Sequence, residues 1–364
     1  MDQRNPTLER LIDQVDRART HRTPLDIRGG GTKVFYGGPP TGEPLDVAVL
    51  SGISSYEPTE LVVTVRAGTL LSELEAQLEQ HGQCLPFEPP RFAPGGTVGG
   101  MVAAGLSGPA RANLGTVRDH VLGATLLNGR GEVLTFGGQV AKNVAGYDVS
   151  RLLVGSLGIL GVICEVSLKV LPVHRASATL RFDWDEPQAL RQLNLWASQP
   201  LPLTASAWHD GRLHVRLAGA AAAVSAACGK LGGAVVAPGA APAWWRSVRD
   251  QTDAFFSLSA AELAGGQCLW RLSLPATAAP VRLPGQQFIE WHGSERWWRT
   301  AADPREVRAA AASAGGHATL MRGADKSAGV FAPVSDVLMR IHRGLKQAFD
   351  PACVFNPGRL YAEL

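Results

Sequence analysis

Three consecutive glycines early in the chain set the first constraint on its fold. They lie in Arg28-Gly29-Gly30-Gly31-Thr32-Lys33, directly after the short apolar run 24–27, which predicts a strand. Glycine lacks a Cβ atom, so such a loop can adopt positive φ and turn several backbone N–H groups toward one point. Concave sets of N–H groups bind anions, most often phosphate. The loop therefore predicts either an anion site, with Arg28 and Lys33 adding positive charge, or a plain turn.

Two more glycine-rich segments follow in the first half of the chain. One reads Pro94-Gly95-Gly96-Thr97-Val98-Gly99-Gly100 and precedes residues 101–105, which predict a short buried helix. The other, residues 155–163, has the spacing G-x-x-G-x-x-G and leads into an apolar strand. A Rossmann dinucleotide site needs G-x-G-x-x-G before a helix, so the sequence disfavours an NAD-binding Rossmann enzyme. Each segment alone is also compatible with an ordinary turn.

Length and composition exclude several classes of protein. A chain of 364 residues exceeds what one core usually supports, so it predicts two domains. The net charge of +3 gives no case for nucleic-acid binding. The five cysteines are scattered without a C-x-x-C pair, which predicts reduced thiols and no iron–sulfur cluster on this chain. The charged first 20 residues do not resemble a secretory signal, and the longest apolar run, 152–164, is too short for a bilayer span.

Hydrophobic periodicity and turn residues predict the secondary structure. Apolar residues at helical spacing predict helices at 7–19, 70–81, 186–197, 218–231 and 336–349, the second of them capped by Thr69. Apolar runs predict strands at 46–50 and 61–65, and hairpins turned at Asn128-Gly129 and Asp210-Gly211. After Pro172 the glycine clusters thin out and all nine tryptophans follow. This change predicts a second domain over residues 173–335.

Motifs in a fixed order resemble a known family. Residues 28–32 (RGGGT), 65–69 (VRAGT), 96–100 (GTVGG), 142–148 (KNVAGYD) and 155–163 (GSLGILGVI) resemble the flavin domain of FAD-linked oxidoreductases of the vanillyl-alcohol-oxidase type, and Asn356-Pro357-Gly358 resembles their closing motif. The resemblance implies an α+β fold with a two-subdomain FAD-binding domain of the PCMH type at 1–172. It further implies a smaller mixed α/β cap domain at 173–335 and a segment at 336–364 that returns to the FAD-binding domain.

The resemblance also implies which residues hold FAD. The diphosphate would lie on the first two glycine segments, whose N–H groups and threonine hydroxyls suit its negative charges. Lys142 and Tyr147 would lie beside the flavin, where a cation stabilises the reduced ring; a surface lysine and a half-buried tyrosine are the alternative. Some members of the family that the chain resembles bind flavin covalently through a histidine in or near the first glycine loop. No histidine lies between residues 22 and 80 here, so the resemblance implies non-covalent FAD. The predicted FAD-binding residues are Arg28, Gly29, Gly30, Gly31, Thr32, Lys33, Gly96, Thr97, Val98, Gly99, Gly100, Lys142, Tyr147, Gly158, Gly161, Ile163 and Asn356.

A closer likeness is to the FAD-binding subunits of bacterial glycolate oxidases, through residues 142–148, 315–320 and 349–360. It implies oxidation of glycolate to glyoxylate within a complex, with a catalytic FAD subunit and an iron–sulfur subunit as partners. It also implies a cytoplasmic chain that is peripheral to the inner membrane through those partners. The H-x-G-D-G-N-x-H cap motif of related catalytic subunits and D-lactate dehydrogenases is absent from the sequence. A stand-alone FAD-linked 2-hydroxyacid dehydrogenase and a non-catalytic assembly subunit remain as alternatives.

The predicted cap offers two catalytic candidates. His317 would serve as a base, and Arg322 would bind a substrate carboxylate; solvent-exposed or packing residues are the alternative for both. His209 and His214 straddle the second hairpin, but without a third ligand nearby we predict no metal site. The tryptophan pairs at 244–245 and 297–298 predict a core or a protein interface.

Overall fold

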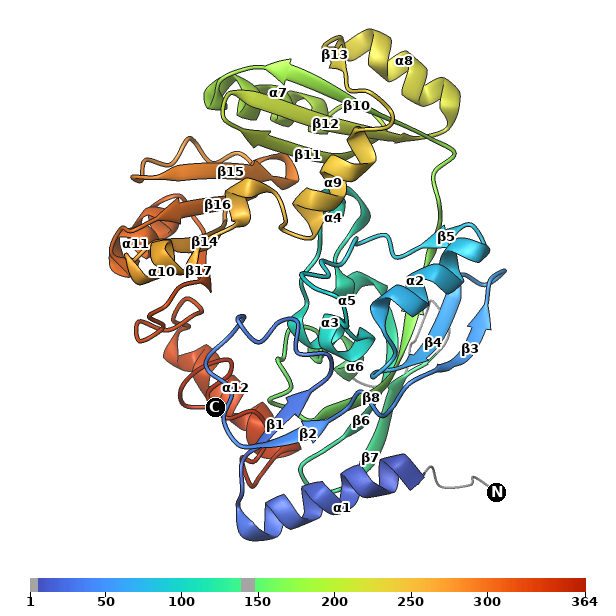
Figure 1. Cartoon of the computed structure of the whole chain (residues 1–364), viewed down its shortest axis with the longest axis vertical. Coiled ribbons are helices and arrows are strands. Elements are labelled where there is room, and N and C mark those ends of the chain that lie inside the picture. The colour runs from blue at the N-terminus through green and yellow to red at the C-terminus, as the bar shows by residue number, and fades with distance from the viewer. Residues whose placement is uncertain (1–5, 139–147) are drawn as a thin grey trace.

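A computed structural model describes residues 6–138 and 148–364, and two large β-sheets organise them (Figure 1). A five-stranded sheet and two small two-stranded sheets lie in the residues up to 172, here called the first part. An eight-stranded sheet is built from residues 176–322, here called the second part. Lys142 and Tyr147 lie outside the described residues, so their predicted position beside the flavin stays a prediction.

The first part combines an antiparallel sheet with helices that share its core. α1 (Pro6–His21) precedes β1 (Leu25–Arg28), which pairs in parallel with β2 (Glu43–Asp46). The larger sheet has the order β3 (Ile53–Glu57), β4 (Val62–Arg66), β8 (Val162–Lys169), β6 (Val121–Leu127), β7 (Val133–Gly137). Apolar faces of α1, α2 (Leu71–Gln80) and α3 (Val98–Ala104) pack with these strands in one core. The shorter elements are β5 (Gln83–Cys84), α4 (Arg111–Leu114), α5 (Val117–His120), α6 (Val149–Leu152) and β9 (Leu171–Pro172).

The C-terminal residues return to this first part. α12 (Asp336–Phe349) leads into a segment in which Phe355 bridges in parallel to Leu25, and the backbone N–H of Asn356 donates to the Leu25 carbonyl at 2.9 Å. Near the end of α12, Lys346 is buried with Asp350, with 2.8 Å between Nζ and Oδ2. The chain end is therefore part of the same packed unit as β1.

The second part is an antiparallel sheet with helices on its outer face (Figure 1). α7 (Glu186–Ala197) and α8 (Ala221–Leu231) pack on one half of it and α11 (Pro304–Ser313) on the other. α9 (Ala241–Arg249) and the short α10 (Ala260–Ala264) connect its two halves. In sheet order, the strands are β13 (Ala234–Val235), β10 (Ala176–Asp183), β12 (Arg212–Gly219), β11 (Leu203–His209), β15 (Gln286–Glu290), β16 (Glu295–Thr300), β14 (Cys268–Ser273) and β17 (His317–Arg322).

The inner face of the eight-stranded sheet packs against the first part. Phe288, Trp297 and Met321 from the sheet share a buried cluster with Tyr36 and Leu106 from the first part. Burial of apolar surface is the main driving force for association. This cluster therefore determines which face of the eight-stranded sheet lies against the first part and its glycine segments.

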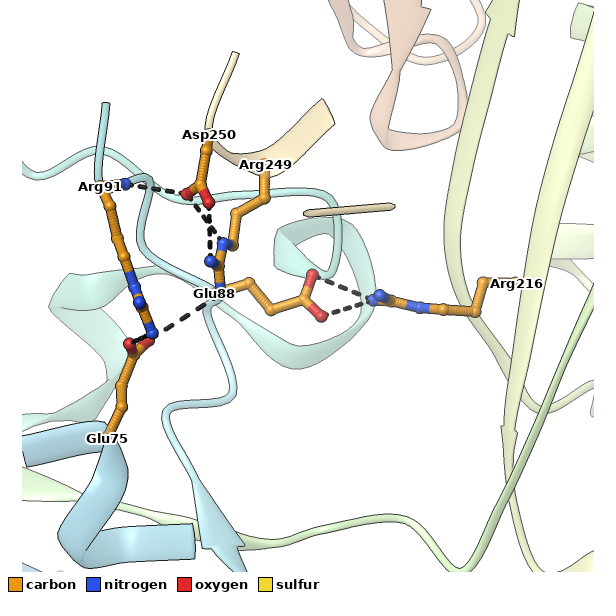
Figure 2. Close-up of polar contacts among 6 residues, drawn as sticks. All are labelled: Glu75, Glu88, Arg91, Arg216, Arg249 and Asp250. Carbon is orange, nitrogen blue, oxygen red and sulfur yellow. Dashed lines mark hydrogen bonds and ion pairs between the residues drawn. The ribbon is translucent and has the colours of Figure 1, made fainter. Parts of the chain in front are cut away.

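Charged side chains join the two parts beside this cluster (Figure 2). Arg216 of β12 pairs with Glu88, at 2.8 Å between Nη2 and Oε1. Asp250, just after α9, accepts from the backbone N–H of Arg91 at 3.0 Å, while the Arg91 side chain pairs with Glu75 of α2. We call Glu75, Glu88, Arg91, Arg216, Arg249 and Asp250 the ionic bridge.

Most sequence predictions of secondary structure are confirmed. The helices at 186–197 and 336–349 and both hairpins form as predicted, while other helix ends move by one to three residues. The predicted strand at 46–50 is wrong, because the Asp46 carboxylate accepts from the Ala48 N–H at 2.9 Å and turns the chain just after β2. Thr69 does not cap α2, since its hydroxyl bonds to Gly52 instead. No helix within residues 6–138 and 148–364 is both long and apolar enough to cross a membrane.

Candidate functional site

Close backbone packing brings the first two glycine segments together. A Cβ atom on Gly30 would overlap the carbonyl oxygen of Gly95, and one on Gly29 would overlap the hydroxyl of Thr97. A Cβ on Gly99 would lie 2.6 Å from the Cβ of Ala67 on the neighbouring turn. Only glycine permits these approaches, so the loop after β1 and the loop before α3 form one continuous wall.

A cavity of about 860 Å³, partly open to solvent, lies on this wall. Gly96 and Val98 are buried and do not line it. The predicted FAD-binding residues that do line it are Arg28, Gly29, Gly30, Gly31, Thr32, Lys33, Thr97, Gly99, Gly100, Gly158, Gly161, Ile163 and Asn356. The fold thus gathers at one cavity the residues that the sequence motifs had singled out separately.

The wall presents hydrogen-bond donors that find no acceptor among the described residues. Within the described chain, the backbone N–H groups of residues 29–33 donate no hydrogen bond. Lys33 lies beside them, and burial lowers its pKa to about 8 because desolvation disfavours the charged ammonium. Its Nζ donates to the Thr32 hydroxyl at 3.4 Å and lies over the Phe92 ring. Unpaired N–H groups and a partly desolvated cation are what an anionic diphosphate requires. The residues present therefore fit FAD.

The facing wall is the 155–163 turn, which Asn356 holds to β1. Its Oδ1 accepts from the Ile27 N–H at 2.7 Å, and its Nδ2 donates to the Leu157 carbonyl at 2.6 Å. Gly158 has a φ of +77°, and a Cβ there would lie 2.6 Å from that Nδ2. Asn356 therefore shapes the cavity through its own hydrogen bonds.

Some residues at the cavity carry no local sequence signal. Arg359 donates from Nη2 to the Tyr36 carbonyl at 2.7 Å, and Lys326 donates to the Phe35 carbonyl at 2.6 Å. These two cations fix the turn that follows Lys33, but they are distant from it in sequence, so spacing could not reveal them. The lining residues missed by sequence reasoning are Asp26, Ile27, Val34, Pro40, Val47, Ala67, Ala103, Ala104, Leu157 and Arg359.

The two catalytic candidates lie at opposite ends of β17, and neither lines the cavity. His317 is exposed and stands opposite Ser273. The Arg322 guanidinium stacks over the Phe35 ring, 4.0 Å from its centre. A strand of this length separates its ends by about 17 Å, so one small substrate cannot contact both side chains.

The two histidines of the second hairpin, where no metal site was predicted, are packed among aromatic rings. His209 stacks on Phe288 at 5.4 Å between ring centres, and His214 lies 4.2 Å from Trp244. In the part of the chain that the structure describes, no group of three or more His, Cys, Asp or Glu side chains could hold a metal ion.

The glycine wall, its cavity and the antiparallel second sheet define an α+β FAD-binding fold of the vanillyl-alcohol-oxidase type. Residues 6–137 match the family described as "FAD binding domain". The solved structure of an alkyldihydroxyacetonephosphate synthase shares the fold, with a TM-score of 0.63 over 97% of this chain and 76% of that chain, at 16% identity.

More similar sequences place the chain in a narrower family. It is 48% identical to glycolate oxidase subunit GlcE of Escherichia coli (strain K12), over 97% of each chain. It is 30% identical to glycolate oxidase subunit GlcD of Bacillus subtilis (strain 168), over 54% of this chain and 43% of that protein. It is 31% identical to a mitochondrial cytochrome D-lactate dehydrogenase of Arabidopsis thaliana, over 44% of this chain and 29% of that protein. The chain belongs to the family of glycolate oxidase GlcE subunits, and the predicted fold and family are confirmed.

Proposed function

We propose that this chain holds FAD non-covalently in the 860 Å³ cavity and acts as a flavin subunit of a glycolate-oxidising complex. The observation that carries the proposal is the row of N–H groups at residues 29–33 that donate to no acceptor in the described part of the chain, beside the half-buried Lys33. The substrate is inferred from the relatives, which are named as glycolate oxidase subunits.

Each wall of the cavity has a task in this proposal. The N–H groups of 29–33, the Thr97 hydroxyl and Lys33 would hold the diphosphate, and Gly158, Gly161 and Ile163 would contact the adenosine end. Bound FAD would supply the acceptor for a hydride equivalent from the carbon that carries the substrate hydroxyl. Because residues 22–80 contain no histidine, no side chain of the first loop offers the family's covalent link.

The proposed complex contains two further subunits, one with an iron–sulfur relay and one that binds FAD. The five cysteines are free and scattered, which favours an iron–sulfur relay on another chain as the destination of the electrons. A GlcD-like FAD subunit is the second proposed partner. The relatives include both a GlcE and a GlcD subunit, and both are named as subunits of glycolate oxidase. Through these partners the complex would lie peripheral to the membrane.

Reconstitution with FAD tests the proposal. The purified chain should take up FAD, release it into the supernatant on acid precipitation, and sustain glycolate turnover only after co-expression with the two partners. Colour that stays on the acid pellet would contradict non-covalent binding. Steady turnover by the isolated chain with glycolate or D-lactate would instead favour the stand-alone dehydrogenase, and a chain that takes up no FAD would favour the assembly subunit.

A further inference from the structure

A smaller pocket, partly open to solvent, lies between the two parts, next to the cofactor cavity. Ala104 lines the cofactor cavity while Leu106 and Ser107 line the pocket, so the chain passes from one to the other within a few residues. Lys33 of the cavity also lies 5.8 Å from the centre of the Phe92 ring, which is a wall of the pocket. A molecule in this pocket would therefore be a close neighbour of a molecule in the cavity.

Two buried carboxyl groups face this pocket from adjacent strands. Glu290 ends β15 and Glu295 begins β16, directly opposite in the strand register, and their exposed fractions are 4% and 2%. Like charges at such a pair of positions repel, and burial adds a desolvation penalty. Burial and the neighbouring carboxylate raise the pKa of Glu290 well above its usual range, and burial raises that of Glu295 to about 8. The pair therefore retains at least one proton at neutral pH.

Positive charge faces the same carboxyl groups. Arg271 of β14 lines the pocket with Nε 4.0 Å from Oε1 of Glu295, and that buried Nε has no hydrogen-bond acceptor within the described residues. Arg111 approaches from α4, close enough for its charge to act on the Glu295 carboxyl. The charged or titratable groups around Glu295 are Glu290, Arg271, Arg111, the Tyr36 hydroxyl, which accepts from Arg271 at 3.4 Å, and Arg249, which lines the pocket.

The turn between the two carboxyl groups has a strained backbone, and hydrogen bonds to the first part hold it in place. Between them, Trp291 and His292 both have positive φ, at 50° and 57°. The Trp291 indole donates to the Gly108 carbonyl at 3.0 Å, and His292 Nε2 lies 2.6 Å from Oδ1 of Asn113. Consecutive non-glycine residues in this conformation persist only where the surroundings enforce them, which is typical of functional sites.

We propose that this pocket binds a small 2-hydroxy monocarboxylate, with Arg271 holding its carboxylate and Glu295 accepting its hydroxyl proton. The assignment rests on the proposed function, because the hydride acceptor is the flavin of this chain. The charges then balance: Arg271 faces the substrate carboxylate, the positive charges of Arg271 and Arg111 act on the ionised Glu295, and Glu290 keeps its proton.

The step balances without another reactant. Oxidation breaks the C–H and O–H bonds of the substrate and forms its C=O bond. With FAD bound as proposed above, the hydride equivalent would go to the flavin, while a carboxylate oxygen of Glu295 accepts the proton. Glu290, hydrogen-bonded to the Trp297 indole at 2.9 Å, stays protonated and lowers the negative charge next to the product.

Glu295→Gln tests the base, and Glu186→Gln is the matched control, since Glu186 is a half-buried carboxyl 3.7 Å from Arg296 outside the pocket. In the FAD-loaded chain, we expect E295Q to slow single-turnover flavin bleaching by glycolate about 100- to 1,000-fold, with the control within about twofold of wild type. The wild-type rate should rise as pH passes through about 8, because the base must be deprotonated. E295Q should lose that rise.

Calorimetric titration with oxamate, an unreactive monocarboxylate analogue, tests binding without flavin chemistry. We expect Arg271→Met to weaken oxamate binding at least about tenfold and E186Q to leave it unchanged. Absence of oxamate binding to the wild-type chain, or wild-type bleaching and pH dependence in E295Q, would overturn the proposal. A chain that holds FAD and supports glycolate turnover in the complex, but is not itself bleached by glycolate, would also overturn it while leaving the proposed function intact.

Discussion

Lys33 shows how one buried charge can link cofactor binding to protonation. Burial lowers its pKa from 10.5 to about 8, so the free chain begins to lose this positive charge in mildly alkaline solution. A diphosphate beside the ammonium favours the charged form and would raise the pKa again. Affinity for FAD should therefore depend on pH through this single side chain.

Replacement of Lys33 by glutamine should weaken FAD binding about 10- to 100-fold, the size expected for a lost charge-assisted hydrogen bond. Wild-type affinity should be constant below about pH 8 and fall above it, as the free chain loses the proton. The variant should show no such fall. Fluorescence titration with FAD measures both, with Lys230→Gln on the exposed face of α8 as control. An affinity for K33Q equal to that of K230Q would refute the role.

At the scale of residues, the sequence allowed prediction of those site members that are recognisable locally. The glycines and Thr97 stand in short motifs whose physical demands are visible within a few positions. Arg359 reaches the cavity only because the C-terminal segment folds back onto β1, and Glu290 faces Glu295 only because of the β15–β16 register. No local pattern carries either relationship.

At the scale of elements, prediction succeeded where local signals agree. α7 and α12 begin after Asp185 and Ser335, whose side chains accept from the first helical turn, and their apolar residues keep helical spacing. β3 was not predicted, because its residues are mostly exposed and it gains its place by pairing with β4. Strands that form mainly because a neighbouring strand pairs with them, and that lack an alternating hydrophobic pattern, are difficult to predict from sequence.

The contact between the two glycine loops yields an element-scale prediction. A methyl group on Gly30 would overlap the Gly95 carbonyl, so Gly30→Ala must push the two loops apart. We expect a loss of about 1–3 kcal/mol in the free energy of unfolding and loss of measurable FAD uptake. Gly239→Ala is the control, because a Cβ there meets nothing within 4 Å. Normal FAD uptake by G30A, measured after desalting, would show that the loops need not touch.

At the scale of the whole molecule, the relation between the two parts decides where the pocket meets the cavity. The buried cluster around Tyr36 and Phe288 supplies apolar contact, and the ionic bridge adds directional contacts beside it (Figure 2). Glu88 and Arg216 form one of the two contact groups of the bridge. Glu88 has a φ of 46°, accepts from the Ala110 N–H at 2.9 Å, and pairs with Arg216. It thus connects the α4 segment to β12.

Removal of the Arg216 charge should loosen this connection. The side chains of Arg216 and Glu88 are only 15% and 27% exposed, so solvent screens their attraction less than it screens a surface pair. Arg216→Gln should lower the free energy of unfolding by about 1–3 kcal/mol and speed hydrogen exchange in β12 and at the end of α9. Arg305→Gln is the control, because Arg305 is 91% exposed in its pair with Asp303 and should change stability by less than about 0.5 kcal/mol.

A double-mutant cycle with Glu88→Gln separates the pair from the rest of the bridge. If Arg216 acts through Glu88, the two substitutions together should destabilise the chain by less than the sum of their separate effects. Urea unfolding gives the free energies, and exchange mass spectrometry shows whether the loosened amides lie where the two parts meet. Strict additivity, or exchange that rises equally in the R305Q control, would mean that the apolar cluster alone holds the second sheet over the cavity.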